Sequence, residues 1–381
     1  MEDIAAIRAQ IPCLDHFSYL NMSYGPKPNP VTEEVIRLIR LTGTQGISNP
    51  EVQDELWGMY EKAREGVAKL LGANTTEISL TRHVSEGMNI VATGFDWSPG
   101  DEVIISNEEH PAGSLPWMNL ALRRGIKVRL LKMSYDLDDL ISQLDSLINQ
   151  RTKIVSLSHV STKSGFLMPA KEITDFVHQK GIPIVFDGAH ATGLVPVNVK
   201  NIGCDFYTSC GHKWILAPQG TGFLYVNESC LDDLQITWLG AATAIKWDLD
   251  NLRFETKTNA DKFEYGTRDL TVYGGLAIAL DQVESHGIEN ISSRSTQLAR
   301  RMKKKVMDMK SFELMTPDSE TLSTGIVSLI DRRNKIQNPT ERLFENHKIM
   351  IAGLDEWTRI SLPYFTLEEE VDRLAEVIEE V

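Results

Sequence analysis

The chain has 381 residues and a formal net charge of −14, which results from 53 acidic and 39 basic side chains. A surface this acidic repels nucleic acid and anionic membranes, so we expect neither as a partner, and an anionic ligand needs a local pocket of basic or N–H groups. No stretch approaches the roughly 20 apolar residues of a membrane-spanning helix. The N-terminus, MEDIAAIRAQ, does not resemble a secretory signal. We therefore expect a cytoplasmic protein, and its length fits two domains.

Helices and strands alternate over the first half of the chain. Apolar residues at three- and four-residue spacing predict helices over 31–41 and 54–71. Short apolar runs then predict strands over 78–80, 102–106, 127–131 and 153–159. A predicted helix follows each strand. The first begins at 85, and the others cover 112–123, 137–147 and 170–180. This alternation predicts βαβ units and a mainly parallel sheet.

In the second half of the chain, we predict first more strands of the same sheet and then a mixture of helices and strands. The strand pattern continues over 182–186, 206–209 and 223–226, and 231–261 reads as an irregular connection. Beyond it we predict helices over 273–285, 291–309 and 366–381, with strands over 325–330 and 357–361. Thr366 and Glu369 have the spacing of a capping box for the last helix. We expect a large domain over 15–262 and a small α+β domain over 263–381, on which 1–14 packs.

The cysteines do not form a recognisable pattern. Cys13, Cys204, Cys210 and Cys230 show no CxxC spacing, which argues against zinc and against a disulfide framework. We expect reduced and mostly buried thiols. No metal is expected in the site.

The most informative stretch is 182–213, where two apolar runs end in polar residues. The first run ends in Asp187, which is followed by Gly188, Ala189 and His190. The second ends in Cys210-Gly211-His212-Lys213. Strand ends at the carboxyl edge of an α/β sheet commonly carry the site. An acid and a lysine on neighbouring strand ends suit a cofactor that needs an anionic and an amine partner.

A second candidate for cofactor binding lies between the strand predicted at 78–80 and the following helix. The turn Thr81-Arg82-His83-Val84 directs free backbone N–H groups outward at the positive end of the helix dipole, which is a natural seat for phosphate. The alternative is a plain N-cap by Ser85, with Glu86 in the first turn.

These residues, together with His110 after a predicted strand, resemble the class V aminotransferase family of pyridoxal-phosphate (PLP) enzymes, a fold-type I group that includes cysteine desulfurases and isopenicillin N epimerase. The resemblance runs from Asn21 to the C-terminal helix, and its most specific part is DGAHA…SCGHKW. It implies an α/β fold with a mainly parallel, mixed seven-stranded sheet flanked by helices, and a smaller C-terminal α+β domain.

The resemblance also implies roles for single residues. Lys213 would hold the cofactor aldehyde as a Schiff base and act as the base, and Asp187 would keep the ring nitrogen protonated. His190 resembles the partner of the ring hydroxyl or of Asp187. His110 resembles the aromatic residue that stacks on the ring, where it could also move protons.

Phosphate contacts follow from the same resemblance. They would come from Val84, Ser85, His212 and position 210, which is commonly Ser or Thr in relatives and is Cys210 here, a weaker donor. Thr267 resembles a threonine that reaches the phosphate from a second subunit, which implies a homodimer.

The substrate residues implied are Arg359, which would clamp a carboxylate, and Asn21, Ser23 and Tyr24 at the substrate entrance. An amino acid is therefore the expected substrate.

The branch of the family is a separate question. Cysteine desulfurases carry a nucleophilic cysteine upstream of the arginine, and 331–356 contains no cysteine. Trp214 and Gly266-Thr267-Arg268-Asp269 favour the isopenicillin N epimerase-like branch, which also contains cysteine C–S lyases. We expect β-elimination on a cysteine-type substrate. The alternatives are transamination, desulfurase-like chemistry, and epimerisation with His110, Tyr24 or His347 as the second acid.

Other classes fit less well. A zinc hydrolase built on His110, His190 and His212 lacks a local HxH or HxxxH spacing. A dinucleotide dehydrogenase needs GxGxxG after an early strand, and Gly220-Thr221-Gly222 precedes a strand and lacks the third glycine. A catalytically silent binding protein is disfavoured by the Asp187–Lys213 pair.

Overall fold

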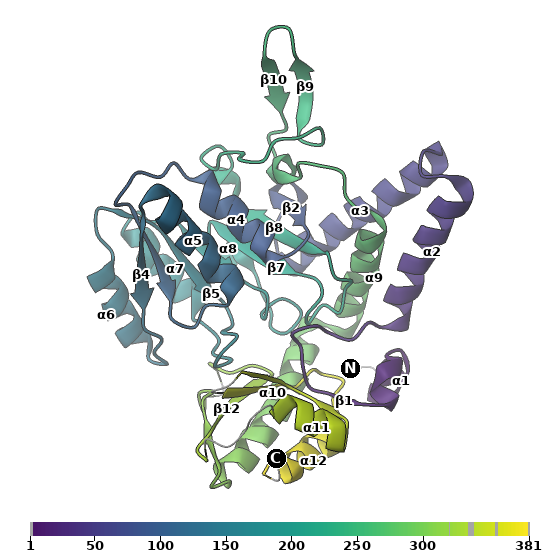
Figure 1. Cartoon of the computed structure of the whole chain (residues 1–381), viewed down its shortest axis with the longest axis vertical. Helices are drawn as coiled ribbons and strands as arrows, with labels where there is room; N and C mark the ends of the chain where they lie inside the picture. Colours follow the sequence, from purple (N-terminus) through teal and green to yellow (C-terminus); the bar gives the residue numbers. More distant parts are fainter. Residues whose placement is uncertain (1–2, 320, 334–338, 355–356, 380–381) are drawn as a thin grey trace.

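The computed structural model describes residues 3–319, 321–333, 339–354 and 357–379. Its centre is a seven-stranded sheet in the order β2-β8-β7-β6-β5-β3-β4 (Figure 1). Neighbours from β7 to β4 run parallel, whereas β8 is antiparallel to both β7 and β2. The strand bounds are β2 (Ile78–Thr81), β3 (Glu102–Ser106), β4 (Lys127–Leu131), β5 (Thr152–Ser158), β6 (Ile184–Asp187), β7 (Phe206–Cys210) and β8 (Gly222–Val226). The predicted α/β class with a mainly parallel, mixed sheet is confirmed.

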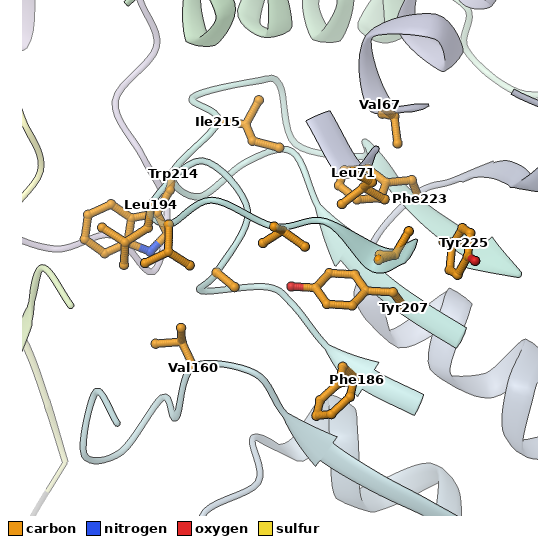
Figure 2. Packing of buried hydrophobic residues seen from close by; sticks show 14 of the residues in the cluster. Val67, Leu71, Val160, Phe186, Leu194, Tyr207, Trp214, Ile215, Phe223 and Tyr225 are labelled. Carbon is orange, nitrogen blue, oxygen red and sulfur yellow. The ribbon is translucent and has the colours of Figure 1, made fainter. Parts of the chain in front are cut away.

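Both faces of the inner strands are buried, which explains why these strands read as apolar runs, whereas β4 at one edge is largely exposed. Along β3, Val103 packs in one core cluster and Ile104 in the other. Figure 2 shows part of the larger cluster, where Val67 and Leu71 lie close to Phe223 of β8. The helices of this part of the chain are α2 (Asn29–Gln45), α3 (Pro50–Leu71), α4 (Val84–Gly94), α5 (Pro111–Arg124), α6 (Leu137–Leu147), α7 (Ala170–Gln179), α8 (Val199–Ile202) and α9 (Thr271–His286).

A second, smaller sheet lies below the first in Figure 1 and has the order β11-β12-β15-β14, all antiparallel. Its strands are β11 (Phe312–Leu314), β12 (Ile326–Asp331), β14 (Ala352–Leu354) and β15 (Trp357–Ser361). The helices α10 (Ile288–Met307), α11 (Pro339–His347) and α12 (Glu368–Val377) belong to the same region. A separate apolar cluster, which includes Leu298, Leu329 and Leu374, forms its core.

The N-terminal segment is tied to this smaller region at two points. Strand β1 (Ser18–Tyr19) pairs in parallel with β13 (Ile349–Met350). Arg8 of α1 (Ile4–Ala9) forms a 2.9 Å ion pair with Glu370 of α12. The division of the chain into domains at 262/263 stays a prediction.

Several local predictions were wrong. The first is the irregular connection at 231–261, which contains an antiparallel hairpin of β9 (Ala244–Asp248) and β10 (Arg253–Thr256) that projects from the body (Figure 1). Its apolar side chains, such as Trp247 and Phe254, are exposed, so they produced no pattern of one buried face. Strands β11, β13 and β14 and helix α11 were also missed.

Two helix caps differ from the prediction. His83, and not Ser85, caps α4, because its Nδ1 accepts a hydrogen bond from the Glu86 N–H at 3.1 Å. The start of α12 lies further along the chain than the predicted capping box. The Glu370 carboxylate accepts from the Leu367 N–H at 2.8 Å, while the Thr366 hydroxyl has no partner among the described residues.

Candidate active site

The candidate site is built at the carboxyl ends of the parallel strands. Asp187 ends β6, and in the register of the sheet it lies opposite Ser158 of β5 and Thr208 of β7. Lys213 follows three residues after the end of β7. Gly188 is required here because a Cβ at this position would lie 2.1 Å from the ring of Tyr207. The fold thus brings the predicted acid and the predicted lysine to one edge.

Asp187 and Lys213 are both buried and influence each other. Burial raises the pKa of Asp187, while Lys213 and a 2.8 Å hydrogen bond from the Ala189 N–H act to lower it. Burial lowers the pKa of Lys213, while Cys210 and Asp187 act to raise it. A lysine with a lowered pKa is a better nucleophile and base near neutral pH.

Glu109 is a site residue that the sequence reasoning missed. Its carboxylate accepts hydrogen bonds from Ser106 Oγ at 2.6 Å, from Ser158 Oγ at 2.6 Å and from the Ser158 N–H at 3.0 Å. A Cβ placed on Gly113 would lie 2.9 Å from Glu109 Oε2 and 3.7 Å from Asp187 Oδ2, so both carboxylates border the same space. Burial raises the pKa of Glu109 to about 7, although these hydrogen bonds act to lower it. Its place beside His110 at the end of β3 was the available signal.

His110 and His190 have different surroundings. His110 caps α5, where its Nδ1 accepts from the Ala112 N–H at 3.1 Å, and burial together with Lys213 and Arg359 lowers its pKa to about 4. The ring of His190 accepts from Trp214 Nε1 at 3.1 Å through Nδ1. A neutral ring then carries its proton on Nε2, which lies 3.2 Å from Thr162 Oγ1.

His190 therefore has Trp214, Thr162 and Arg359 as partners in the described structure, with Arg359 Nη1 3.3 Å from Nε2, and no bond to Asp187 is found there. Burial lowers the pKa of His190 far below its ordinary value, and Lys213 and Arg359 act in the same direction. Thr162 had not been predicted to belong to the site.

The predicted phosphate residues lie partly together. Val84, which begins α4, forms a small buried apolar cluster with Ala112, Ala189 and Cys210. Burial raises the pKa of Cys210 to about 11, so this side chain is a thiol at neutral pH. Ser85 is the second residue of α4.

His212 and Thr267 lie in two different places. The ring of His212 stacks on Tyr24 at 5.4 Å, and burial, with Lys213 and Lys27, lowers its pKa to about 4. Thr267 is exposed and lines a separate hollow of about 420 Å³ with Arg82, Gln219 and neighbouring residues.

Arg359, on β15, provides a buried cation. Its Nη1 donates to Thr162 Oγ1 at 2.6 Å, and its Nη2 donates to Ser23 Oγ. The buried Nε has no partner among the described residues. Burial lowers the pKa of Arg359 to about 10, which leaves it charged at neutral pH.

The segment before α2 completes the predicted substrate residues. Asn21 Oδ1 accepts from the Ser23 N–H at 3.0 Å, and Asn21 Nδ2 donates to the Ile351 carbonyl at 3.3 Å. Asn21 therefore links Ser23 to the backbone between β13 and β14. The side chain of Tyr24 is about half exposed and covers His212.

These elements enclose a cavity of about 350 Å³, called the substrate cavity below. It combines residues from the N-terminal segment, the ends of β3 and β5, and the small sheet. Its lining consists of Ser23, Asn107, Glu108, Glu109, His110, Pro111, Thr162, Lys163, Ala352, Gly353, Trp357 and Arg359. The structure thus brings together Arg359, Ser23 and His110. His347, which ends α11, is not part of this lining.

Across the described part of the chain, no group of three or more His, Cys, Asp or Glu side chains is placed to hold a metal ion. None of the described helices is both long and apolar enough to cross a membrane.

Comparison with known proteins defines the family. The sequence model of the family described as Aminotransferase class-V matches residues 24–374. Isopenicillin N epimerase of Streptomyces clavuligerus is 29% identical over 94% of this chain and 92% of its own length. A probable cysteine desulfurase of Methanothermobacter thermautotrophicus is 28% identical over 98% of this chain and 97% of its own. An apo structure of a cysteine desulfurase from Thermococcus onnurineus NA1 superposes with a TM-score of 0.89 at 26% identity and covers 100% of this chain and 98% of that one.

The fold and the strand-end site define an α/β enzyme of fold type I. The chain belongs to the class V aminotransferase family, and like the enzymes of that family it uses PLP. It is related to both cysteine desulfurases and isopenicillin N epimerase.

The residues at the strand ends fit PLP on the evidence of their packing. The cluster of Val84, Ala112, Ala189 and Cys210 is separate from the main cores and offers an apolar surface for a planar ring. Asp187 uses Oδ1 for the Ala189 N–H, while Oδ2 borders the space that Gly113 leaves free. That second oxygen is available for a ring N–H.

Proposed function

We propose that this protein is a PLP-dependent C–S lyase, which carries out β-elimination on cysteine, cystine or a cysteine conjugate or sulfoxide. The observation that carries the proposal is the state of the thiols. Burial raises the pKa of Cys13, Cys204, Cys210 and Cys230. None of the four lines the substrate cavity. A thiol that is neither ionised nor in the cavity is poorly suited to relay sulfur, which supports direct release of a sulfur species.

The chain's own residues have distinct tasks in this reaction. Arg359 binds the α-carboxylate, and its Nε supplies a donor that none of the described groups uses. Lys213 Nζ, whose pKa burial lowers, takes the α-proton. Asp187 would hold the ring nitrogen in its protonated form, and bound PLP supplies an electron sink for the charge at Cα.

The leaving group decides the product. When Cβ carries sulfur, the Cβ–S bond breaks and the sulfur leaves with the electron pair. The resulting enamine tautomerises and hydrolyses to a keto acid and ammonia. Burial of Lys213 and Asp187 keeps water away from the proton-transfer step.

The site residues retain the roles implied by the family resemblance, as part of the proposal. Val84, Ser85, Cys210 and His212 would hold the phosphate, and Thr267 would reach it from a second copy in a homodimer. The exposure of Thr267, in a hollow distinct from the substrate cavity, supports a contact with another subunit. His110 would stack on the ring.

Epimerisation is the second candidate, because isopenicillin N epimerase is 29% identical over 94% of this chain. Inversion at Cα needs an acid on the face opposite Lys213. His110 has a pKa of about 4 and is therefore neutral at pH 7. Tyr24 covers His212, and His347 is outside the lining of the substrate cavity. These observations favour elimination.

One assay decides between the two. The PLP-loaded protein is incubated in heavy water with cysteine, cystine and S-alkyl cysteines, and keto acid, released sulfur and α-deuterium are measured. We expect pyruvate in stoichiometric amounts with the sulfur product. Exchange at Cα with inversion and without keto acid would instead identify an epimerase, and formation of the amine form of the cofactor would identify a transaminase.

A further inference from the structure

The substrate cavity contains two opposite charges that do not pair with each other. Glu108 and Lys163 both line it, yet no ion pair joins them within 4.0 Å among the described residues. Lys163 Nζ has no hydrogen-bond partner there, and neither has Glu108 Oε1. Two unpaired charges of opposite sign in one cavity are complementary to a ligand that carries both.

The Glu108 carboxylate is held in place by a tight turn. Its Oε2 accepts from Ser161 Oγ and from Ser164 Oγ, each at 2.5 Å. Ser161 and Ser164 are themselves buried. Ser161 Oγ also accepts from the Lys163 N–H at 3.1 Å, so the turn that orients the acid also carries the lysine. The turn at 161–164 therefore orients the Glu108 carboxylate and also carries Lys163.

The same turn reaches the other end of the cavity. Thr162, between Ser161 and Lys163, accepts the 2.6 Å hydrogen bond from Arg359 Nη1. One turn thus connects the cation for the α-carboxylate with the Glu108–Lys163 pair. A volume of about 350 Å³ leaves room beyond a single small amino acid.

We propose, resting on the lyase function above, that the substrate cavity selects amino acids whose side chain ends in a second ammonium and carboxylate. Sulfur joins the two ends, as in a disulfide or thioether of two amino acids. Glu108 binds the distal ammonium and Lys163 binds the distal carboxylate. Arg359 binds the carboxylate of the reacting end.

The reaction of such a substrate balances without an external oxidant or reductant. Lys213 takes the α-proton of the reacting half, and the Cβ–S bond breaks with its electron pair on sulfur. With a disulfide substrate and one water, the products are a keto acid, ammonia and the other half as its persulfide. The distal charges leave with that second product, so Glu108 and Lys163 do not take part in bond breaking.

The test compares cystine with S-methylcysteine, whose side chain ends without charge. We expect Glu108→Gln and Lys163→Met each to lower the ratio of kcat/KM for cystine to that for S-methylcysteine by about tenfold, since each removes one charge-assisted contact. Glu172→Gln, an exposed acid on α7, is the matched control and should leave the ratio within about twofold. An equal loss for both substrates, or no loss for either, would overturn the inference.

A binding measurement separates this inference from the lyase proposal. Calorimetry with the PLP-loaded Lys213→Ala protein should show cystine binding that weakens by about tenfold in Glu108→Gln, and S-methylcysteine binding that weakens much less. If no substrate yields keto acid but this preference persists, the lyase proposal fails and the inference stands. If keto acid forms but cystine binding is insensitive to both substitutions, the inference fails and the lyase stands.

Discussion

The two halves of the site are assembled in different ways. One half, called the strand-end half, contains Asp187 and Lys213. These residues lie at the ends of adjacent strands and are 26 residues apart in the sequence. The substrate cavity takes Ser23, Glu108, Thr162 and Arg359 from four segments spread over most of the chain. The cofactor chemistry is therefore encoded in one short stretch, whereas substrate choice depends on how two sheets and the N-terminal segment pack.

Charge is balanced differently in the two halves as well. In the strand-end half, Asp187 and Lys213 partly compensate each other before any ligand binds. In the substrate cavity, Arg359 has hydroxyl and carbonyl partners but no carboxylate among the described residues. In the proposed function, the first half holds the cofactor, and the second leaves an anion site open for the substrate.

The largest expected effect is in the strand-end half. Lys213→Ala removes the proposed base and cofactor anchor, so we expect kcat to fall by at least about 10³-fold. PLP should still bind through its other contacts, and borohydride should no longer fix it to the protein. Cofactor absorbance is measured before and after dialysis to follow PLP binding, and turnover is measured in parallel. Substantial turnover in the variant would show that Lys213 is not the base.

A buried arginine of the substrate cavity should behave unlike a buried arginine of the core. Arg359→Met is expected to reduce kcat/KM about 100-fold, mainly through KM, because a charge-assisted contact to the substrate is lost. Its free energy of unfolding should change little, since the substitution removes a buried charge that has no carboxylate partner.

Arg64 is the matched control. It forms a 2.6 Å buried ion pair with Glu264, so Arg64→Met leaves a buried carboxylate unpaired. This variant should lose about 3 kcal/mol or more of unfolding free energy in urea. If Arg359→Met were the more destabilising of the two, its role would be structural.

Glu109 allows a pH test of the strand-end half. Its folded pKa of about 7 is above the ordinary value of 4.5, so the folded state holds more protons than the unfolded state between these values. Stability from this group is therefore lost as pH rises from about 4.5 to 7. Glu109→Gln should remove this slope, on the order of 3 kcal/mol.

Urea unfolding at pH 5 and pH 7.5 measures the difference, and comparison with wild type cancels the contribution of the buried histidines. The exposed Glu313→Gln on β11 serves as the control. A wild-type slope that persists in Glu109→Gln would mean that another group titrates. The absorbance of bound PLP should show the same change if Glu109 acts on Asp187.

The sequence predicted the regions in which burial follows a regular pattern. The bounds of β3, β4, β15 and α6 agree with the prediction. In β3, β15 and α6 the apolar pattern follows a buried face. The β9–β10 hairpin was missed because its large apolar side chains are exposed.

Glu109 was missed for a different reason. Its importance depends on Ser158 and on Asp187, which the fold brings from later strands, and nothing in its own neighbourhood reveals those contacts. The same holds for Thr162, whose link between His190 and Arg359 exists only after the two sheets pack. These partners are distant in the sequence, so they cannot be predicted from the residues next to the charge.

The smallest expected effect concerns Cys210, where the cofactor half departs from the family pattern. Cys210 is buried against Val84 and Ala189, and its thiol is a weak donor. Cys210→Ser replaces it with a stronger donor of similar size, so PLP affinity should stay the same or rise by up to about tenfold if this side chain touches the phosphate. Fluorescence titration of the apo protein with PLP measures this. A loss of turnover with PLP affinity retained would indicate instead that the thiol takes part in the chemistry, and would move the sulfur reaction from the substrate cavity to the strand-end half.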